Sequence, residues 1–258
     1  MHPAGNESID TGSIFDRSVE LPVWKRAIDI AFSLAAMPVL ALCTLMMAIV
    51  MKITSPGPVF FRQERVGLRG RRFKIFKFRT MVVDADTKTH KAHWDKLIHS
   101  SVPMVKLDTR DSRLIPGGWL LRASGVDELP QLINVLRGDM SIIGPRPCIP
   151  YEYEQYLPWQ RERFEATPGL TGLWQVSGKN RTTFEEMIHL DIHYVRNRSF
   201  WLDVKIVLRT APALLLQVRD TRQHRQWSAL PRKTAAPFPR KLSSTEISYQ
   251  QREPAVDN

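Results

Sequence analysis

Cysteine is scarce in this chain of 258 residues, which contains only Cys43 and Cys148. Cys43 falls in an apolar stretch, so we expect no structural disulfide and a reducing compartment. Acidic residues are also few, because 26 Asp and Glu stand against 37 Lys and Arg and leave a net charge of +11. This excess predicts an acidic partner: nucleic acid, anionic lipid or a phosphorylated substrate.

The two ends of the chain lack the patterns of a folded core. Residues 1–23 have no periodicity and no basic start typical of a secretion signal, which predicts a disordered tail. Residues 218–258 are rich in Arg, Gln, Ser, Thr and Pro, which predicts a second, basic disordered tail. The region between them is long enough for one sizeable core.

Charge is missing altogether from Ile30 to Met51. A straight helix of that length, at about 1.5 Å per residue, would just cross a bilayer core of about 30 Å. Pro38 must bend such a helix, and both flanks are basic, which favours the cytoplasmic face for both ends. We therefore expect residues 24–51 to enter the membrane, bend at Met37 and Pro38, and return. An ordinary spanning helix is the alternative.

Basic residues gather directly after this segment. Residues 52–83 carry nine Lys and Arg and a single nearby acid, Glu64. A glycine-bounded turn at residues 67–70 between two aromatic-rich stretches predicts a β-hairpin. Since a membrane segment lies directly upstream, this charge favours anionic lipid headgroups over nucleic acid.

Two adjacent acids, Asp127 and Glu128, precede a segment, Leu129 to Leu136, with apolar residues at helical spacing. A helix N-cap with an acidic first turn is the simplest interpretation. Arginines at 122 and 146 favour a chemical role instead, because acids among arginines suit a divalent cation and a phosphorylated substrate.

The stretch from Asp127 to Pro147, DELPQLINVLRGDMSIIGPRP, resembles the signature of the bacterial sugar transferases, in particular the monotopic phosphoglycosyl transferases. Blocks at residues 25–29, 55–60, 73–81 and 168–178 resemble further family blocks in family order, so the resemblance covers roughly residues 24–217. Met37 departs from the pattern, where a serine usually precedes the proline, and Lys179 replaces an arginine.

The resemblance implies an α/β fold, namely a small membrane-associated catalytic domain over residues 52–217 with an N-terminal re-entrant segment and interfacial amphipathic helices. It implies transfer of a hexose-1-phosphate from a UDP-sugar to undecaprenyl phosphate, with release of UMP, as the first step of exopolysaccharide, capsule or O-antigen synthesis. Asp127 would form a covalent phosphosugar intermediate with help from Glu128, and both would hold Mg²⁺.

The same resemblance implies which other side chains meet the substrates: Lys77, Arg79, Arg122, Arg146, Gln175, Lys179 and Arg181. The enzyme would lie in the bacterial inner membrane, with its catalytic domain on the cytoplasmic face and no nucleic-acid partner. Galactose and glucose both remain open as the sugar, and so does a homodimer. A membrane-anchored polyanion-binding protein, whose acids only cap a helix, is the alternative from another class.

Overall fold

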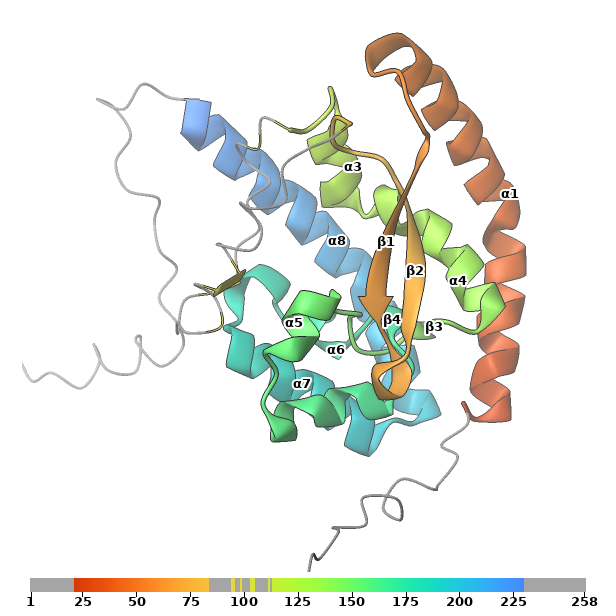
Figure 1. Cartoon of the computed structure of the whole chain (residues 1–258), viewed down its shortest axis with the longest axis vertical. Helices are drawn as coiled ribbons and strands as arrows, with labels where there is room; N and C mark the ends of the chain where they lie inside the picture. Colours follow the sequence, from red (N-terminus) through yellow and green to blue (C-terminus); the bar gives the residue numbers. More distant parts are fainter. Residues whose placement is uncertain are drawn as a thin grey trace, which may run out of the picture.

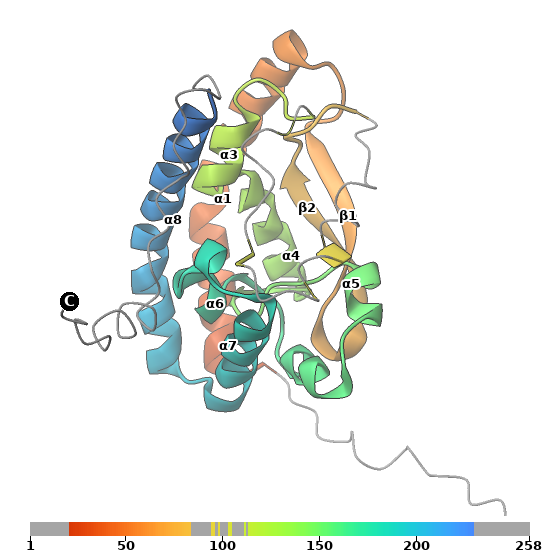
Figure 2. The ribbon, with the colours of Figure 1, turned by 90° about the vertical axis from the view of Figure 1, so that its left-hand side faces the viewer.

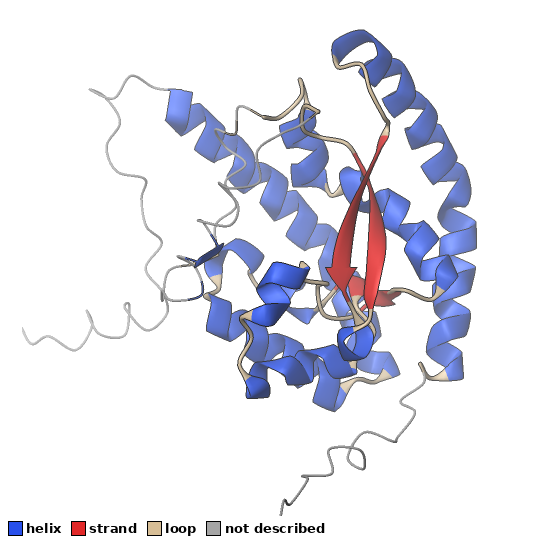
Figure 3. Cartoon of the chain, in the orientation of Figure 1, coloured by secondary structure: helices blue, strands red, loops and turns tan. Residues whose placement is uncertain are grey.

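The structure is a computed structural model that describes residues 21–83, 94–95, 98, 103–104, 111 and 113–229. Helices dominate this part of the chain, and two small sheets make it a mixed α/β fold (Figure 3). The expected α/β class is therefore confirmed. Most of both predicted tails, residues 1–20 and 230–258, lies outside the described residues.

Helix α1 (Val23–Thr54) runs along one edge of the molecule (Figure 1). Its length and composition suffice to cross a membrane, and only 17% of its most apolar window is buried. Pro38 lies inside the helix without ending it, since a proline removes one backbone hydrogen bond while neighbouring turns keep theirs. The expected turn back at Met37 and Pro38 is thus not present as a break, and the re-entrant path stays a prediction.

The predicted hairpin is confirmed. Strand β1 (Phe60–Val66) pairs antiparallel with β2 (Arg72–Phe78), and a short 3₁₀ turn, η1 (Leu68–Gly70), joins them. Arg69 and Gly70 close the turn with φ of 51° and 79°, in the left-handed region that hairpin turns require.

The acidic segment lies in the middle of the fold. Helix α3 (Gly118–Ser124) leads through Gly125 into the 3₁₀ helix η3 (Val126–Gln131), which continues as α4 (Leu132–Arg137). Both acids stand in the first turn of η3, but Gly125 and not an acid occupies its N-cap. The expected N-cap role of the acids is therefore wrong, whereas the expected acidic first turn is confirmed. Gly138 ends α4 with φ 83°.

A small parallel pair of strands lies beside the acidic segment. Strand β3 (Ser141–Ile143) pairs with β4 (Gly169–Thr171). The remaining elements are α5 (Pro150–Glu154), η4 (Pro158–Glu165), α6 (Leu173–Val176), η5 (Lys179–Arg181) and α7 (Phe184–Asn197).

Helix α8 (Phe200–Ala229) closes the described chain and extends past the expected domain boundary at 217. The stretch after 217 contains no proline or glycine before Pro231, and its Arg and Gln residues are good helix formers. Composition suggested a disordered tail from Val218, but polar composition alone does not stop a helix that is already formed.

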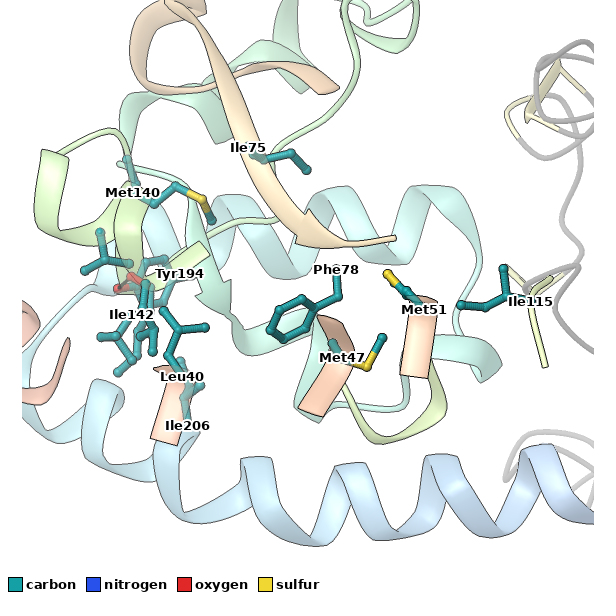
Figure 4. Packing of buried hydrophobic residues seen from close by; sticks show 14 residues of the cluster. Leu40, Met47, Met51, Ile75, Phe78, Ile115, Met140, Ile142, Tyr194 and Ile206 are labelled. Carbon is teal, nitrogen blue, oxygen red and sulfur yellow. Dashed lines mark hydrogen bonds between the residues drawn. The ribbon is translucent and has the colours of Figure 1, made fainter. Parts of the chain in front are cut away.

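The main hydrophobic core joins α1 to the rest of the fold (Figure 4). Leu40 packs near Ile206 of α8, whereas Met47 and Met51 pack beside Phe78 of the hairpin. A second cluster of buried side chains surrounds α7.

Buried polar contacts hold the first turns of α1 as well. The Lys25 ammonium lies 2.6 Å from the Asp203 carboxylate of α8. Asp29 accepts hydrogen bonds from the Ile142 amide at 2.9 Å and from the Ser141 hydroxyl at 3.1 Å. Both halves of α1 therefore rest on the same domain.

Candidate functional site

Two cavities meet at the acidic segment. The larger one has a volume of about 860 Å³ and lies between α1 and α8, and residues of α3, η3, β3 and β4 form its base. The smaller one, about 20 Å³, is walled by the β1–β2 hairpin and the Pro-Arg-Pro turn after β3. Glu128, Leu170 and Gln175 line both cavities. Figure 2 shows α8 and the hairpin on opposite sides of the molecule, so Glu128 stands between two different approaches.

The smaller cavity is strongly basic. It is lined by Arg65 of β1, Lys77 of β2 and Arg146 of the Pro-Arg-Pro turn. Burial, and then the neighbouring Arg146, lower the pKa of Arg65 to about 10, which still leaves it charged at neutral pH. Three cations and one carboxylate, Glu128, surround a space of about one water molecule. The lining is therefore net positive, and the cavity has room for one oxygen of a phosphate whose other atoms lie outside it.

The Lys77 ammonium lies 2.7 Å from the Glu128 carboxylate. Both side chains are mostly buried, with 17% and 23% of their surfaces exposed. This ion pair fixes Glu128 where the cavities join.

A buried arginine supports the Pro-Arg-Pro turn. Arg163 of η4 donates to the Arg146 carbonyl at 3.0 Å, to the Asp191 carboxylate of α7 and to the Tyr156 hydroxyl. Arg163 and Asp191 are each only 2% exposed at their side chains. The guanidinium thus joins η4, α7 and the segment at Tyr156 to the backbone of Arg146. Arg163 therefore holds Arg146 in the cavity wall, although Arg163 itself does not line the cavity.

The two acids differ in their access to the cavities. Glu128 lines both, whereas Asp127 is 7% exposed and is not among the lining residues of either. A 3₁₀ helix has three residues per turn, so side chains of adjacent residues point in directions about 120° apart. The sequence placed the acids together, but the helix type separates their side chains.

Gln175 of α6 offers an unsatisfied acceptor at the junction. Its Nε2 donates to the Leu170 carbonyl at 3.2 Å, while its Oε1 is buried with no hydrogen-bond partner among the described residues. A buried polar atom in that state costs about 1–3 kcal/mol, so a ligand hydroxyl that donates to it would be bound favourably.

The glycines around β4 serve backbone packing. A Cβ on Gly169 would lie 2.0 Å from the Gly144 nitrogen, and one on Gly172 would lie 2.2 Å from the Gly144 oxygen. The absence of a side chain at Gly169 and Gly172 therefore lets this loop approach the backbone after β3 closely. Leu170 and Gln175 of the same stretch line both cavities together with Glu128.

The remaining expected site residues divide into two groups. Arg122, Lys179 and Arg181 line the larger cavity. Arg79 lines neither cavity and is 5% exposed, because its guanidinium donates to the Pro58 carbonyl at 2.8 Å and to Ser55. In this structure Arg79 thus supports the loop after α1, and its contact with a substrate phosphate stays a prediction.

Sequence reasoning missed Arg65 and Arg163. Arg65 stood inside a run of basic residues, and nothing in that run distinguished it from its exposed neighbours. Arg163 lay in a stretch rich in Tyr, Glu and Trp that suggested a surface or membrane-interface helix. Whether a single charged side chain is buried depends on the tertiary structure, so no local signal pointed to either residue.

The metal expectation rests on the acidic pair alone. The described residues contain no group of three or more His, Cys, Asp or Glu side chains that could hold an ion. Mg²⁺ at phosphate sites takes one or two carboxylates and completes its shell with water and phosphate oxygens, so Glu128 in the cavity lining suits it, whereas Asp127 would have to turn toward the ion. Binding of Mg²⁺ by both acids stays a prediction.

Comparison with known proteins places this site in a family. A family model described as bacterial sugar transferase matches residues 21–217, most of the chain. The chain belongs to the bacterial sugar transferase family. It is therefore a transferase enzyme, and its apolar α1 is consistent with membrane association.

Relatives of this sugar transferase have specific names. The chain is 39% identical over 205 residues to a UDP-glucose:undecaprenyl-phosphate glucose-1-phosphate transferase of Caulobacter vibrioides. The aligned region covers 76% of the chain and 72% of that relative. It is 36% identical over 198 residues to the exopolysaccharide production protein ExoY of Sinorhizobium fredii, with 74% and 85% covered.

A third relative is longer. The chain is 45% identical over 163 residues to the galactosyl transferase CpsE of Streptococcus agalactiae, which covers 62% of the chain but only 35% of CpsE. The chain thus spans about a third of that relative and most of ExoY. The names include both a glucose and a galactose transferase, so they leave the sugar open.

Proposed function

We propose that this sugar transferase moves a hexose-1-phosphate from a UDP-sugar to undecaprenyl phosphate and releases UMP, as the first step of polysaccharide assembly. One observation carries the proposal: a basic cavity and a large apolar cavity meet at a single carboxylate, Glu128. A phosphorylated, water-soluble donor and a lipid acceptor need such an arrangement. The name of the relative from Caulobacter vibrioides contains both substrates, with glucose as the sugar, and the name of the relative from Sinorhizobium fredii supports a role in exopolysaccharide production.

The first step would take place in the basic cavity. The diphosphate of the donor would lie against Arg65, Lys77 and Arg146, whose charges offset the repulsion between an anionic nucleophile and an anionic phosphate. A carboxylate oxygen of Asp127, which lines neither cavity in this structure, would turn toward the basic cavity and attack the β-phosphorus. The bond from that phosphorus to the bridging oxygen would break, and its electron pair would leave with UMP.

The second step would return the enzyme to its starting state. An oxygen of undecaprenyl phosphate would attack the same phosphorus, and the bond to Asp127 would break. This forms the lipid diphosphosugar and regenerates the carboxylate. A covalent intermediate allows a soluble and a lipid substrate to react without meeting in the site.

Mg²⁺ would be held by Asp127 and Glu128, and when bound it would supply further charge neutralisation at the phosphoryl group. Lys77 is paired with Glu128 in the structure, so donor binding would exchange this pair for contacts with phosphate. The Oε1 atom of Gln175 would accept a hydrogen bond from a hydroxyl group of the sugar or the ribose.

We also propose that the catalytic domain and both ends of α1 lie on the cytoplasmic side of the inner membrane. A straight spanning helix of this length would separate its ends by about 48 Å across the bilayer. Lys25 and Asp29 instead contact the domain at one end of α1, and Met51 packs into it near the other. The exposed apolar side chains of α1 would face lipid.

Release of UMP tests the reaction. Solubilised enzyme would receive Mg²⁺, undecaprenyl phosphate and one UDP-sugar at a time. With one of the sugars we expect a single turnover of UMP from donor alone and continued UMP release only when the lipid is present, both lost in Asp127→Asn and retained in the surface variant Arg196→Gln. Absence of UMP with every sugar, together with salt-sensitive binding of nucleic acid, would favour the polyanion-binding alternative.

A trapping experiment tests the roles of the two acids. Enzyme incubated with donor alone should gain the mass of one hexose phosphate, and peptide mapping should locate it on Asp127. An adduct on Glu128, the carboxylate that lines both cavities, would reverse the assignment. UMP formed only when the lipid is present, without any adduct, would argue for direct transfer.

A further inference from the structure

The large cavity has the shape of a trough, by which we mean the space between α1 and α8. Its walls are mostly apolar, from Trp24, Ile28 and Phe32 on α1 and Val204, Val207, Leu208, Ala211 and Leu214 on α8. It follows α8 from Phe200 to Asp220, which corresponds to about 30 Å of helix. A volume of about 860 Å³ is in the range of real ligand sites, but a trough so long and apolar suits a chain better than a compact molecule.

The two ends of the trough differ in charge. The charged residues at the end near Trp24 are Lys25, Asp29 and Asp203, so this end has no excess of positive charge. Lys25 is paired with Asp203, and Asp29 accepts hydrogen bonds from Ser141 and Ile142. The other end holds three basic side chains, Arg122, Lys179 and Arg181, beside Asp220. Three basic side chains against the one carboxylate of Asp220, which the Arg181 guanidinium approaches to 3.0 Å, make this end net positive before Glu128 is counted.

The basic end is also the catalytic end. Glu128 and Gln175, which line the trough, also line the small basic cavity. An amphiphile that lay in the trough with its anionic head at Arg122 and Lys179 would therefore have that head next to the reacting groups.

We propose that the trough between α1 and α8 binds the isoprenoid chain of the lipid acceptor, with the phosphate at the Arg122 and Lys179 end. This inference rests on the proposed function. The charge asymmetry and the continuity with the small cavity select a single-chain lipid phosphate over a phospholipid, whose head has no reason to reach Glu128. Burial of apolar chain against apolar wall supplies the affinity.

The proposal assigns the trough residues to one substrate. A block in the trough should therefore impair use of the acceptor and spare the reaction with the donor. Ala211→Trp places an indole in the trough from α8. Leu215→Trp places the same group on the same helix at a side chain that is 73% exposed and lines neither cavity.

We expect Ala211→Trp to raise the KM for undecaprenyl phosphate about tenfold or more, while the single-turnover release of UMP from donor alone changes less than about twofold. Wild-type enzyme should prefer undecaprenyl phosphate to farnesyl phosphate, and Ala211→Trp should lose this preference. Leu215→Trp should match the wild type in both measurements. An unchanged KM and chain-length preference in Ala211→Trp would overturn the proposal.

Photolabelling provides a test that needs no turnover and no substitution. Wild-type enzyme would receive a polyprenyl phosphate with a diazirine in its chain. Labels on residues 24–32 and 204–214 would support the trough, and labels confined to other surfaces would overturn it. If the wild type releases no UMP from any UDP-sugar, the proposed function fails, and this experiment still decides whether the trough binds the lipid.

Competition separates the other occupants. Undecaprenyl phosphate should displace the label, and phosphatidylglycerol should not. Equal displacement by phosphatidylglycerol would assign the trough to bilayer lipid and overturn the proposal. A third outcome is that the protein is a dimer and that Ala211→Trp dissociates it without a change in the KM for the acceptor. This outcome would assign the trough to a second copy of the chain and would also overturn the proposal.

Discussion

Lys77 and Glu128 are 51 positions apart in the chain, yet the Lys77 Nζ atom lies 2.7 Å from Glu128 Oε1. The contact joins the β-hairpin to the acidic segment. It holds the carboxylate at the junction of the two cavities, and it puts a cation where a substrate phosphate would bind.

Removal of the Lys77 charge should therefore weaken use of the donor. We expect Lys77→Met to lower kcat/KM for the UDP-sugar about 10-fold to 100-fold, because hydrogen bonds to charged groups contribute about 1.5–3 kcal/mol. Lys77→Arg should retain part of the activity. Lys74 lies on the same strand and is exposed, so Lys74→Met is the matched control. Equal losses in Lys77→Met and Lys74→Met would exclude a specific role for Lys77.

Disruption of the Arg163–Asp191 pair should destabilise the fold. Arg163→Gln would leave a buried carboxylate without its cation, at a cost of about 3–5 kcal/mol. Thermal or denaturant unfolding of solubilised protein measures this. Arg163→Met combined with Asp191→Leu should recover much of the loss, since both charges are then gone.

A surface ion pair provides the control for that experiment. Arg196 and Glu162 are 2.6 Å apart, but their side chains are 66% and 34% exposed, so Arg196→Gln should cost no more than about 1 kcal/mol. A buried pair that proved as weak as this one would contradict the assigned support of Arg146.

The buried carboxylate of Asp29 should couple α1 to β3. Asp29→Leu removes the acceptor of the Ile142 amide and the Ser141 hydroxyl, and we expect faster hydrogen exchange at residues 141–143. Ala31→Leu, on an exposed part of α1, should leave this exchange unchanged. The coupling would be refuted by identical exchange in both variants.

The Cys148 thiol should remain protonated at pH values far above those at which a cysteine thiol ordinarily ionises. Burial raises its pKa to about 12, and only 2% of the residue is exposed. The unfolded thiol ionises near pH 9.0, so the folded state keeps a proton that the unfolded state has lost between pH 9 and about 12. This contribution to stability is complete below pH 9 and decreases as pH rises, by at most about 1.4 kcal/mol per pH unit.

Two measurements check the Cys148 prediction. In Cys43→Ala, a thiol reagent at pH 9 should label Cys148 slowly in buffer and rapidly in denaturant. Cys148→Ala should lose less stability than the parent between pH 8 and 10.5. Similar losses in both proteins would mean that the thiol does not contribute to the pH dependence.

Local features of the fold could be predicted from the sequence. The turn at residues 67–70 and its aromatic flanks fixed the hairpin, since both signals are local. Gly138 marked the end of α4 because few other residues adopt its left-handed conformation at low cost. The end of α8 was misjudged, because composition predicts disorder poorly where an established helix can simply continue.

The membrane segment was located by its missing charge, but its path was not. Pro38 predicts a distortion, and α1 contains it as one helical element. The polar contacts that hold its first turns to the domain involve partners more than 100 positions away, namely Ser141, Ile142 and Asp203. Pattern reasoning has no access to such pairings.

The sequence by itself determined the chemistry that is available: an acidic pair, a Pro-Arg-Pro turn, an uncharged apolar helix and a large basic excess. The tertiary structure decided which of these side chains meet. It brought Arg65 into the basic cavity, withdrew Arg79 into the loop after α1, and gave the junction of the cavities to Glu128 while Asp127 is buried. The physical reason is that residue type fixes charge and hydrogen-bonding capacity, whereas burial and distance arise only when remote segments pack together.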